Sequence, residues 1–251
     1  MCTLSIIALS SGGSAPGLRL VINRDESAVR AAALEPRWFD LSPVGHHAGA
    51  SGGIGLGVAR AGQHATKGIW PVDPVGGGTW VAANERGVAF AILNKNMDPK
   101  PELPSGLRSR GAIIPAIAHV ASVRDGVDLV RAIDTQQFAP FRLVVSAAGA
   151  GVVRGVVCAW DRRELVIEEF AAPLCLASSG LGDHLVQVRL PLFDEIVRTA
   201  ASAAAQDAFH GHSWADRPDR SVLMRRPGYR TVSVTTVEVV DGRVAMWYRA
   251  V

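Results

Sequence analysis

The sequence predicts an α+β fold, arranged as a four-layer αββα sandwich in which two antiparallel sheets lie between helices. Short apolar runs separated by turn residues are typical of antiparallel strands, and helix-like segments are grouped between these runs. The composition is even over all 251 residues and shows no linker-like stretch. We therefore expect a single domain that spans residues 1–251.

The first half of the chain is predicted to form two hairpins. Residues 3–9 and 18–23 are strand-like runs, joined by a connector rich in Gly, Ser and Pro. Residues 79–84 and 87–94 form a second pair around an Asn-Glu-Arg-Gly turn. Residues 40–68 are rich in Gly, His and Ser and lack a clear period, so we expect a loop there.

The second half adds helices and further strands. Residues 110–121, with Ser109 as the expected N-cap, and residues 124–133 carry helical patterns, and the alanine-rich segment 190–209 is the longest predicted helix. The remaining strands are expected at 141–147, 152–160, 165–170, 174–177, 230–240 and 244–248. The last two are joined at Asp241-Gly242, a strong hairpin turn signal.

Charge and cysteine content exclude several classes of protein. The 26 Lys and Arg residues nearly balance the 23 Asp and Glu residues, and no dense basic run occurs, so no nucleic-acid partner is predicted. Three cysteines without a CxxC pair indicate neither a disulfide framework nor a metal site. The sparse cysteines favour a reducing compartment, so we expect a cytoplasmic protein. We expect no metal or other cofactor.

A membrane span is not predicted either. The longest apolar stretch, residues 143–160, is interrupted by Arg154 and by glycines, and it fits two strands better than one spanning helix. The sequence carries no signal for an oligomeric state.

Cys2 is the most informative single residue. Met aminopeptidases remove Met1 before small residues, which would make Cys2 the mature N-terminus. Such a residue combines a thiol nucleophile with an α-amine whose pKa lies near 8, close enough to neutrality to accept the thiol proton. Two interpretations stay open here: an N-terminal nucleophile, or an incidental buried thiol.

Polar residues at the end of the second strand are expected to lie beside Cys2. The strand closes on Asn23-Arg24-Asp25-Glu26, and hairpin pairing brings this end next to the N-terminus. Arg24 could hold a thiolate or a substrate carboxylate, and Asp25 could orient the α-amine. The alternative is a solvated charged turn.

A glycine-rich segment supplies further candidates. Asp73-Pro-Val-Gly-Gly-Gly-Thr-Trp80 permits close approach of the backbone to a ligand, and Asn84 follows at a hairpin tip, where its amide could stabilise an oxyanion. Trp80 could line a substrate pocket. Ordinary tight turns and core packing are the alternatives.

These segments together resemble the NRDE family, also called the transport and Golgi organisation family. The resemblance covers about the first 110 residues. It is carried by Met-Cys-Thr at the start, by the NRDE tetrapeptide, by Gly-Gly-Thr-Trp ending at Trp80, by Asn94 closing the next strand, and by Ser109-Arg110-Gly111. That family is similar to the N-terminal-nucleophile hydrolases of the penicillin V acylase and bile-salt hydrolase group.

The resemblance implies roles for individual residues. Cys2 matches the nucleophile and Asp25 the aspartate of that group, whereas Arg24 lies two residues beyond the usual arginine position, where Ile22 stands. The Asn-Glu-Lys-Gly turn of the group matches the segment from Asn84, which would place Asn84 in an oxyanion hole.

Two further matches are looser, and two more residues complete the expected binding site. Ser178 stands where the group has a functional asparagine, and Arg189 is the nearest counterpart of its later arginine. We expect these two residues, together with Asn23 and Trp80, to bind the substrate.

Two functions remain open at this point. The first is a cysteine N-terminal-nucleophile hydrolase that acts on a non-peptide amide or acyl bond of a small molecule. The second is a non-catalytic binding or trafficking protein on the same scaffold, for a hydrophobic anion such as haem or an acyl-CoA-type lipid.

Overall fold

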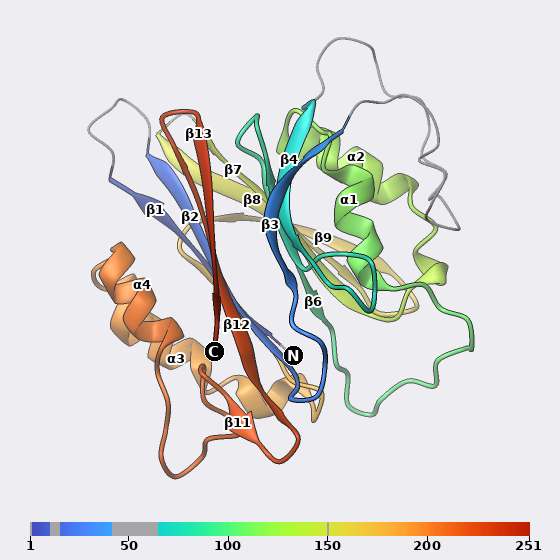
Figure 1. The fold of residues 1–251 in the computed structure, drawn as a ribbon, viewed down its shortest axis with the longest axis vertical. Coiled ribbons are helices and arrows are strands. Elements are labelled where there is room, and N and C mark those ends of the chain that lie inside the picture. The colour runs from blue at the N-terminus through green and yellow to red at the C-terminus, as the bar shows by residue number, and fades with distance from the viewer. Residues whose placement is uncertain (1, 11–15, 42–64, 150) are drawn as a thin grey trace.

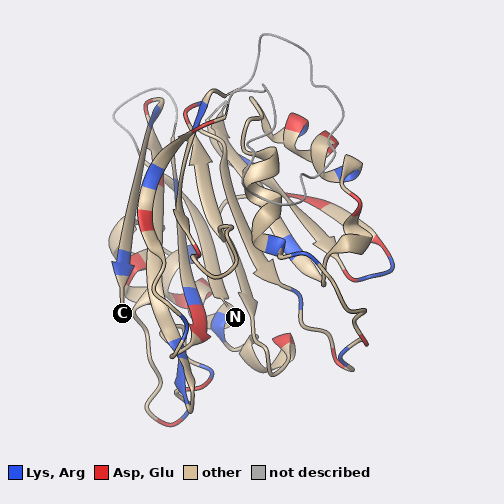
Figure 2. Ribbon diagram, turned by 45° about the vertical axis from the view of Figure 1, so that its right-hand side comes forward, with Lys and Arg blue, Asp and Glu red and all other residues tan. Residues whose placement is uncertain are grey.

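The computed structural model describes residues 2–10, 16–41, 65–149 and 151–251. In these ranges the chain forms two antiparallel sheets that face each other (Figure 1). Figure 2 shows Lys and Arg segments interspersed with Asp and Glu segments, mostly at strand ends, loops and helices. The antiparallel sheets and the mixed α+β class are as predicted.

The first sheet has six strands and contains both ends of the described chain. Its order is β10-β1-β2-β12-β11, and β13 also pairs with β12. The strands are β1 (Cys2–Leu9), β2 (Gly17–Ser27), β10 (Leu174–Ser178), β11 (Arg225–Arg226), β12 (Tyr229–Val240) and β13 (Arg243–Ala250). The hairpin of β1 and β2 and the hairpin of β12 and β13 confirm the first and last predicted strand pairs.

The second sheet has seven strands in sequence order, from β3 to β9. They are β3 (Leu34–Asp40), β4 (Lys67–Val72), β5 (Val81–Asn84), β6 (Ala89–Asn94), β7 (Phe141–Gly149), β8 (Val152–Trp160) and β9 (Leu165–Ala171). The ends of the predicted loop 40–68 belong to β3 and β4, and most of that loop, residues 42–64, lies outside the described residues.

The main hydrophobic core lies where the two sheets meet. Alternate side chains of each strand point to this interface, so Leu4, Ile6, Leu20 and Ile22 of the first sheet are fully buried, as is Phe90 of the second. Burying a side chain of this size contributes roughly 1.5–3 kcal/mol to the free energy of unfolding. This core holds the two sheets, and the residues at their ends, in a definite relation.

Short helices lie against the sheets. α1 (Ile113–Ile117) contacts β6, α2 (Val123–Ala132) contacts β7 and β8, α3 (Arg189–Phe193) contacts β10, and α4 (Ala203–His210) contacts β1 and β2. Single helical turns also occur at η1 (Arg110–Ala112), η2 (Thr135–Gln137), η3 (Asp183–Val186) and η4 (Asp194–Arg198). No helix in the described ranges is long and apolar enough to cross a membrane.

The predicted long helix 190–209 is wrong. The chain forms α3, continues into one π turn, η4, and then leaves the helical conformation before α4 starts. Ser202 has extended backbone angles, and its side chain accepts a hydrogen bond from the N–H of Ala205. A serine cap of this kind begins a new helix, and alanine content alone does not reveal it.

The helix predicted at 110–121 is also shorter than expected. Ser109 makes no capping bond through its side chain, and η1 precedes α1. The carbonyl of Gly111 accepts the N–H of Thr79, and the carbonyls of Ala118 and Val120 accept the side-chain amide of Asn84. Contacts with the second sheet therefore replace helical hydrogen bonds at both ends of the segment.

Candidate active site

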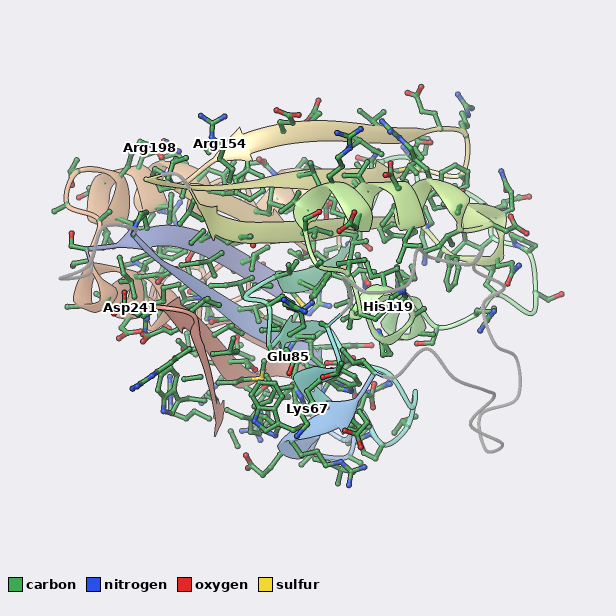
Figure 3. The ribbon with its side chains drawn as sticks, turned by 90° about the horizontal axis from the view of Figure 1, so that it is seen from above. Lys67, Glu85, His119, Arg154, Arg198 and Asp241 are labelled. Carbon is green, nitrogen blue, oxygen red and sulfur yellow. The ribbon has the colours of Figure 1, made fainter. Side chains whose placement is uncertain are left out.

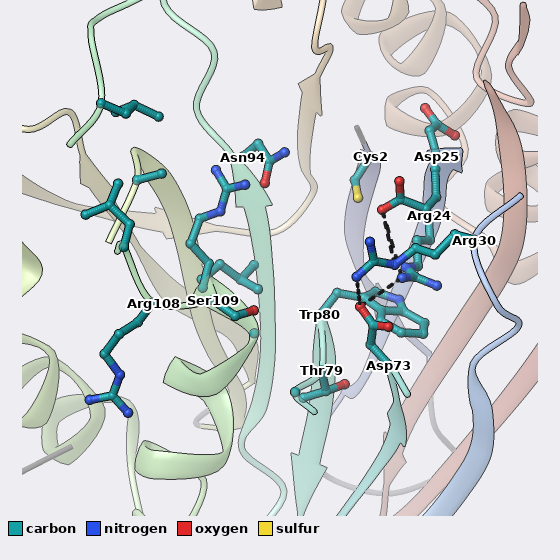
Figure 4. A pocket seen from close by; sticks show the side chains of 18 of the residues that line it. Cys2, Arg24, Asp25, Arg30, Asp73, Thr79, Trp80, Asn94, Arg108 and Ser109 are labelled. Atoms are coloured by element: carbon teal, nitrogen blue, oxygen red, sulfur yellow. Dashed lines mark hydrogen bonds and ion pairs between the residues drawn. The ribbon is translucent and has the colours of Figure 1, made fainter. Parts of the chain in front are cut away.

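Cys2 lines a cavity of about 460 Å³ at one end of the two sheets (Figure 4). The first sheet contributes Cys2 and Arg24, and the second sheet contributes Asn94. Asp73, Trp80 and the chain before α1 complete the wall. Charged and polar side chains around a thiol make this cavity the candidate active site.

Strand pairing determines the neighbours of Cys2. In the first sheet Cys2 lies opposite Arg24 of β2 on one side and Ser178 of β10 on the other. The backbone N–H of Cys2 donates to Oγ of Ser178 over 3.2 Å. The sequence prediction that the NRDE segment lies beside the N-terminus is confirmed by this register.

The thiol of Cys2 is almost completely buried. Burial raises the pKa of the Cys2 thiol above its ordinary value, and the Asp25 carboxyl adds to this. The backbone N–H of Asp25 and the guanidinium of Arg24 act in the opposite direction, but burial outweighs them. The thiol is therefore protonated at neutral pH, and its use as a nucleophile requires a base.

Arg24 is held by an ion-pair cluster at the cavity wall. Its Nη2 atom lies 3.2 Å from Oδ2 of Asp73, and Nη2 of Arg30 lies 2.6 Å from the same oxygen. The guanidinium of Arg24 also stacks over the ring of Trp80, 4.4 Å from its centroid. Burial would raise the pKa of Asp73, but hydrogen bonds from Arg30 and from a backbone N–H lower it overall.

Asp25 is among the residues that line the cavity of Cys2, but its carboxyl contacts Thr231 and Arg189. Its Oδ1 accepts a hydrogen bond of 2.6 Å from Thr231, and Oδ2 lies 3.7 Å from Nη1 of Arg189. Burial raises the pKa of the Asp25 carboxyl, and the charge of Arg189 offsets part of this effect. The backbone N–H of Asp25 donates a hydrogen bond to the sulfur of Cys2.

Arg189, predicted to bind the substrate, is not among the residues that line the cavity of Cys2. It is 1% exposed, and it donates to Oγ1 of Thr3 over 2.6 Å and to the carbonyl of Arg220 over 3.0 Å. Together with the ion pair to Asp25, these contacts place Arg189 beneath the sheet as a support for Asp25.

Asn23 is likewise turned away from the cavity. Its side-chain amide donates to the carbonyls of His210 and Val222, both at 2.9 Å, and its oxygen lies 2.8 Å from Nδ1 of His210. Asn23 therefore joins β2 to the end of α4 and cannot contact a substrate beside Cys2. Alternation of side chains along β2 explains why Asn23 and Arg24 serve opposite faces.

Asn84 cannot serve as the predicted oxyanion donor. Both of its amide hydrogens are used by the carbonyls of Ala118 and Val120, and its oxygen accepts from the N–H groups of Arg86 and Val88. Figure 3 looks onto the end of the molecule that carries this turn, whereas the N-terminus lies at the lower end in Figure 1.

Asn94, and not Asn84, is the asparagine that lines the cavity of Cys2. β6 begins beside the Asn84 turn and ends at Asn94, so the two asparagines are separated by at least the full length of that strand, about 16 Å at 3.3 Å per residue. Asn94 lines the cavity together with Cys2 (Figure 4). In the sequence, Asn94 is a polar residue that closes an apolar strand, and it is part of the pattern that resembles the NRDE family.

The remaining predicted residues are close to Cys2. Trp80 lines the cavity and supports Arg24, as described above. Ser178 is fully buried and contacts the backbone of Cys2, so it touches the nucleophile candidate instead of a substrate. Arg110, which sequence reasoning did not place in the site, also lines the cavity.

A metal site is not evident in the described ranges, where no three His, Cys, Asp or Glu side chains are grouped closely enough to hold a metal ion.

The chain was compared with family models, with curated proteins and with solved structures. No family model matches the sequence, and no curated protein matches it. Among solved structures, the chain is similar to the Caenorhabditis elegans N-acylethanolamine-hydrolyzing acid amidase (NAAA) ortholog, with a TM-score of 0.48 and 12% sequence identity over 96% of this chain and 93% of that chain.

Proposed function

We propose that this protein is an N-terminal-nucleophile cysteine hydrolase that cleaves an amide or acyl bond of a small molecule. The observation that carries the proposal is the place of Cys2, which is the second residue of the chain, lies opposite Arg24, and lines a polar cavity that Asn94 also lines. We also propose that the two sheets and their helices form the four-layer αββα arrangement of such hydrolases, and that the chain is an NRDE-family protein.

Removal of Met1 would create the base that the buried thiol requires. The new α-amine at Cys2 has an ordinary pKa near 8, so a substantial part of it is neutral at pH 7–8 and can accept the thiol proton. Its nitrogen is the atom that now lies 3.2 Å from Oγ of Ser178. In this proposal Ser178 holds the amine in the orientation needed for proton transfer.

Attack on the substrate follows from this arrangement. The Cys2 thiolate forms a bond to the carbonyl carbon, and the electron pair of the C=O bond moves to oxygen. The side-chain amide of Asn94 donates to this oxyanion, in place of Asn84. The C=O bond then re-forms, the bond from the carbonyl carbon to the leaving group breaks, and the ammonium at Cys2 gives its proton to the leaving group. The acyl group remains as a thioester on Sγ until water attacks it and releases the acid.

Arg24 and Asp25 have separate tasks in this scheme. Arg24 lies opposite Cys2, and the ion pair with Asp73 keeps its guanidinium in place. The positive charge of Arg24 therefore stabilises the thiolate form of Cys2. Asp25 presents its backbone N–H to the sulfur, and its carboxyl is fixed from below by Thr231 and Arg189. No cofactor enters the reaction.

A comparison of three variants tests the proposal with a panel of N-acyl amides. Cys2→Ala should abolish hydrolysis, and a chain with a lysine inserted before Cys2, which retains Met1, should lose it to the same extent. Cys175→Ala, a matched thiol removal outside the cavity, should retain the wild-type rate. Hydrolysis that persists in Cys2→Ala or in the Met-retaining chain would contradict the proposal.

A further inference from the structure

A second cavity of about 240 Å³ adjoins the cavity of Cys2. The two cavities share Asn94, Leu103, Arg110 and Ala139 in their walls. The common wall therefore contains the amide side chain of Asn94 and the guanidinium of Arg110. A ligand whose reactive group lies at Cys2 can extend past Arg110 into this second space.

The walls of the second cavity carry positive charge and no negative charge in the described part of the chain. Its cationic side chains are Lys95, Lys100 and Arg110, and none of its lining residues is Asp or Glu. Two acidic residues lie nearby without lining the cavity: Asp183 pairs with Arg142 at 2.7 Å and accepts hydrogen bonds from Asn96, and the exposed Asp98 lies 3.8 Å from His184. The cavity thus has a local excess of cations.

Arg110 differs from the other arginines around Cys2. Arg24 and Arg30 share the carboxylate of Asp73, whereas Arg110 donates to the carbonyl of Pro140 over 2.9 Å and has no carboxylate within ion-pair distance among the described residues. A guanidinium has five N–H donors in a planar fork, so most of its hydrogen-bonding capacity is available for a ligand.

The environment of Arg110 also makes its charge costly to leave unpaired. Burial lowers the pKa of the Arg110 guanidinium, and only a thiolate at Cys2 acts against this effect. A half-buried cation without a carboxylate is stabilised when an anion binds to it. The second cavity offers the space for such an anion, and the apolar side chains of Leu103, Met97 and Ala139 would contact the part of the ligand that leads to it.

We propose that the second cavity is an anion subsite, and that the substrate cleaved at Cys2 carries a carboxylate or a phosphate group that binds Arg110. Lys100 and Lys95 add positive charge on the far side, although Lys95 also lies 3.6 Å from Asp161. This inference rests on the proposed function in naming the cleaved molecule, but the anion subsite itself can be tested without the thiol.

Matched alkylating probes test the subsite through Cys2. N-iodoacetylglycine, its neutral amide and N-iodoacetylaminomethylphosphonate differ only in the group that would reach Arg110. The rate of alkylation at Cys2 is followed by peptide mass for each probe and is divided by the rate of the same probe with free cysteine. After this normalisation, either both anionic probes or the carboxylate probe alone should react faster than the neutral amide. We expect a preference of about tenfold, the size of one charge-assisted hydrogen bond.

Variants locate the preference. The preference is the ratio of the rate of an anionic probe to the rate of the neutral probe, which cancels any change in the reactivity of the thiol itself. Arg110→Gln should bring this ratio close to one, Arg110→Lys should retain most of it, and Lys100→Gln should reduce it. Arg131→Gln, an exposed arginine on α2 outside both cavities, should change nothing. A wild-type chain without preference, or an Arg110→Gln chain with full preference, would overturn the inference.

A binding measurement separates this inference from the proposed function. Cys2→Ala should be stabilised against heating by millimolar N-acetylglycine and not by N-acetylglycinamide, and Cys2→Ala combined with Arg110→Gln should lose the effect. If the thiol is inert but this stabilisation is found, the subsite stands and the hydrolase proposal fails. If the thiol is reactive but acid and amide behave alike, the subsite fails and the hydrolase proposal stands.

Discussion

Cys2 has neighbours that come from distant parts of the chain. Arg24 belongs to the next strand, but Ser178 pairs with Cys2 across 176 positions and Asn94 belongs to the other sheet. Each of them approaches a different part of the same residue or of its cavity. The chemistry of the thiol is therefore determined by single side chains whose removal has separable effects.

The two asparagines provide a matched test at this scale. Asn94→Ala should lower kcat by about 10²–10³-fold with little loss of stability, as expected for an oxyanion donor. Asn84→Ala should leave kcat nearly unchanged and destabilise the protein by about 2–4 kcal/mol, because two buried carbonyls and two N–H groups lose their partner. Steady-state kinetics and urea unfolding of both variants check this. The reverse pattern would return the oxyanion role to Asn84.

At the scale of elements, His210 at the end of α4 bonds to both β1 and β2. Nε2 of His210 lies 2.7 Å from Oγ of Ser5, and Nδ1 lies 2.8 Å from Oδ1 of Asn23. Burial, together with the positive charges of Arg19 and Arg189, lowers the pKa of His210 to about 3. The folded protein thus keeps this imidazole neutral far below its ordinary pKa.

This burial makes stability depend on pH. Below about pH 6.5 the unfolded chain binds a proton at His210 while the folded chain does not until about pH 3, so the free energy of unfolding decreases as the pH falls through this window. A difference of about 3.5 pKa units corresponds to at most about 5 kcal/mol. Urea unfolding between pH 7 and 4 should show a smaller decrease for His210→Gln than for the wild type. His184→Gln, a change at an exposed histidine, should keep the wild-type slope.

Gly78 and Gly111 pass close to each other at the cavity wall, and we call this contact the glycine crossing. A Cβ atom added to Gly78 would overlap the backbone of Gly111, and the N–H of Thr79 bonds to the carbonyl of Gly111. This close approach connects the strand that follows Trp80 with the segment that carries Arg110. It is a position where only glycine fits.

Substitution of Gly78 should therefore affect both stability and the site. Gly78→Ala should destabilise the protein by about 1–3 kcal/mol or more, because the backbone must shift to admit the methyl group, and it should slow alkylation of Cys2 as the wall moves. Gly77→Ala offers a control: its φ of +67° is unfavourable for alanine, but nothing lies within 4 Å of the added atom. Its cost should be about 1 kcal/mol with an unchanged alkylation rate. Equal effects in the two variants would show that the crossing does not position the site.

For the whole molecule, local sequence patterns were sufficient to predict most strands and the pairing of strands that follow each other in the chain. The hairpin of β1 and β2 could be predicted from its apolar runs, and with it the contact between Cys2 and Arg24. The extended strand β12 and the turn at Asp241-Gly242 were equally accessible, because turn chemistry is local.

Long-range arrangement could not be predicted in the same way. The hydrogen bond from Cys2 to Ser178 and the burial of Arg189 beneath Asp25 depend on which strands and helices meet, and no spacing in the sequence encodes this. Asn84 and Asn94 both stand at strand ends, and only the course of β6 shows which one reaches Cys2. The break at Ser202 is local, but the alanine-rich flanks conceal it.

The central claim is that Cys2 is a processed and activated N-terminal nucleophile. The most direct measurement is the intact mass of the purified protein before and after brief treatment with iodoacetamide at neutral pH, followed by peptide mapping. We predict a chain that lacks Met1 and carries one label, at Cys2. Cys158, whose pKa is raised to about 12 by burial, and the half-buried Cys175, whose pKa is also raised, should remain unmodified. A chain that retains Met1, or a Cys2 that reacts no faster than the other two thiols, would contradict the claim.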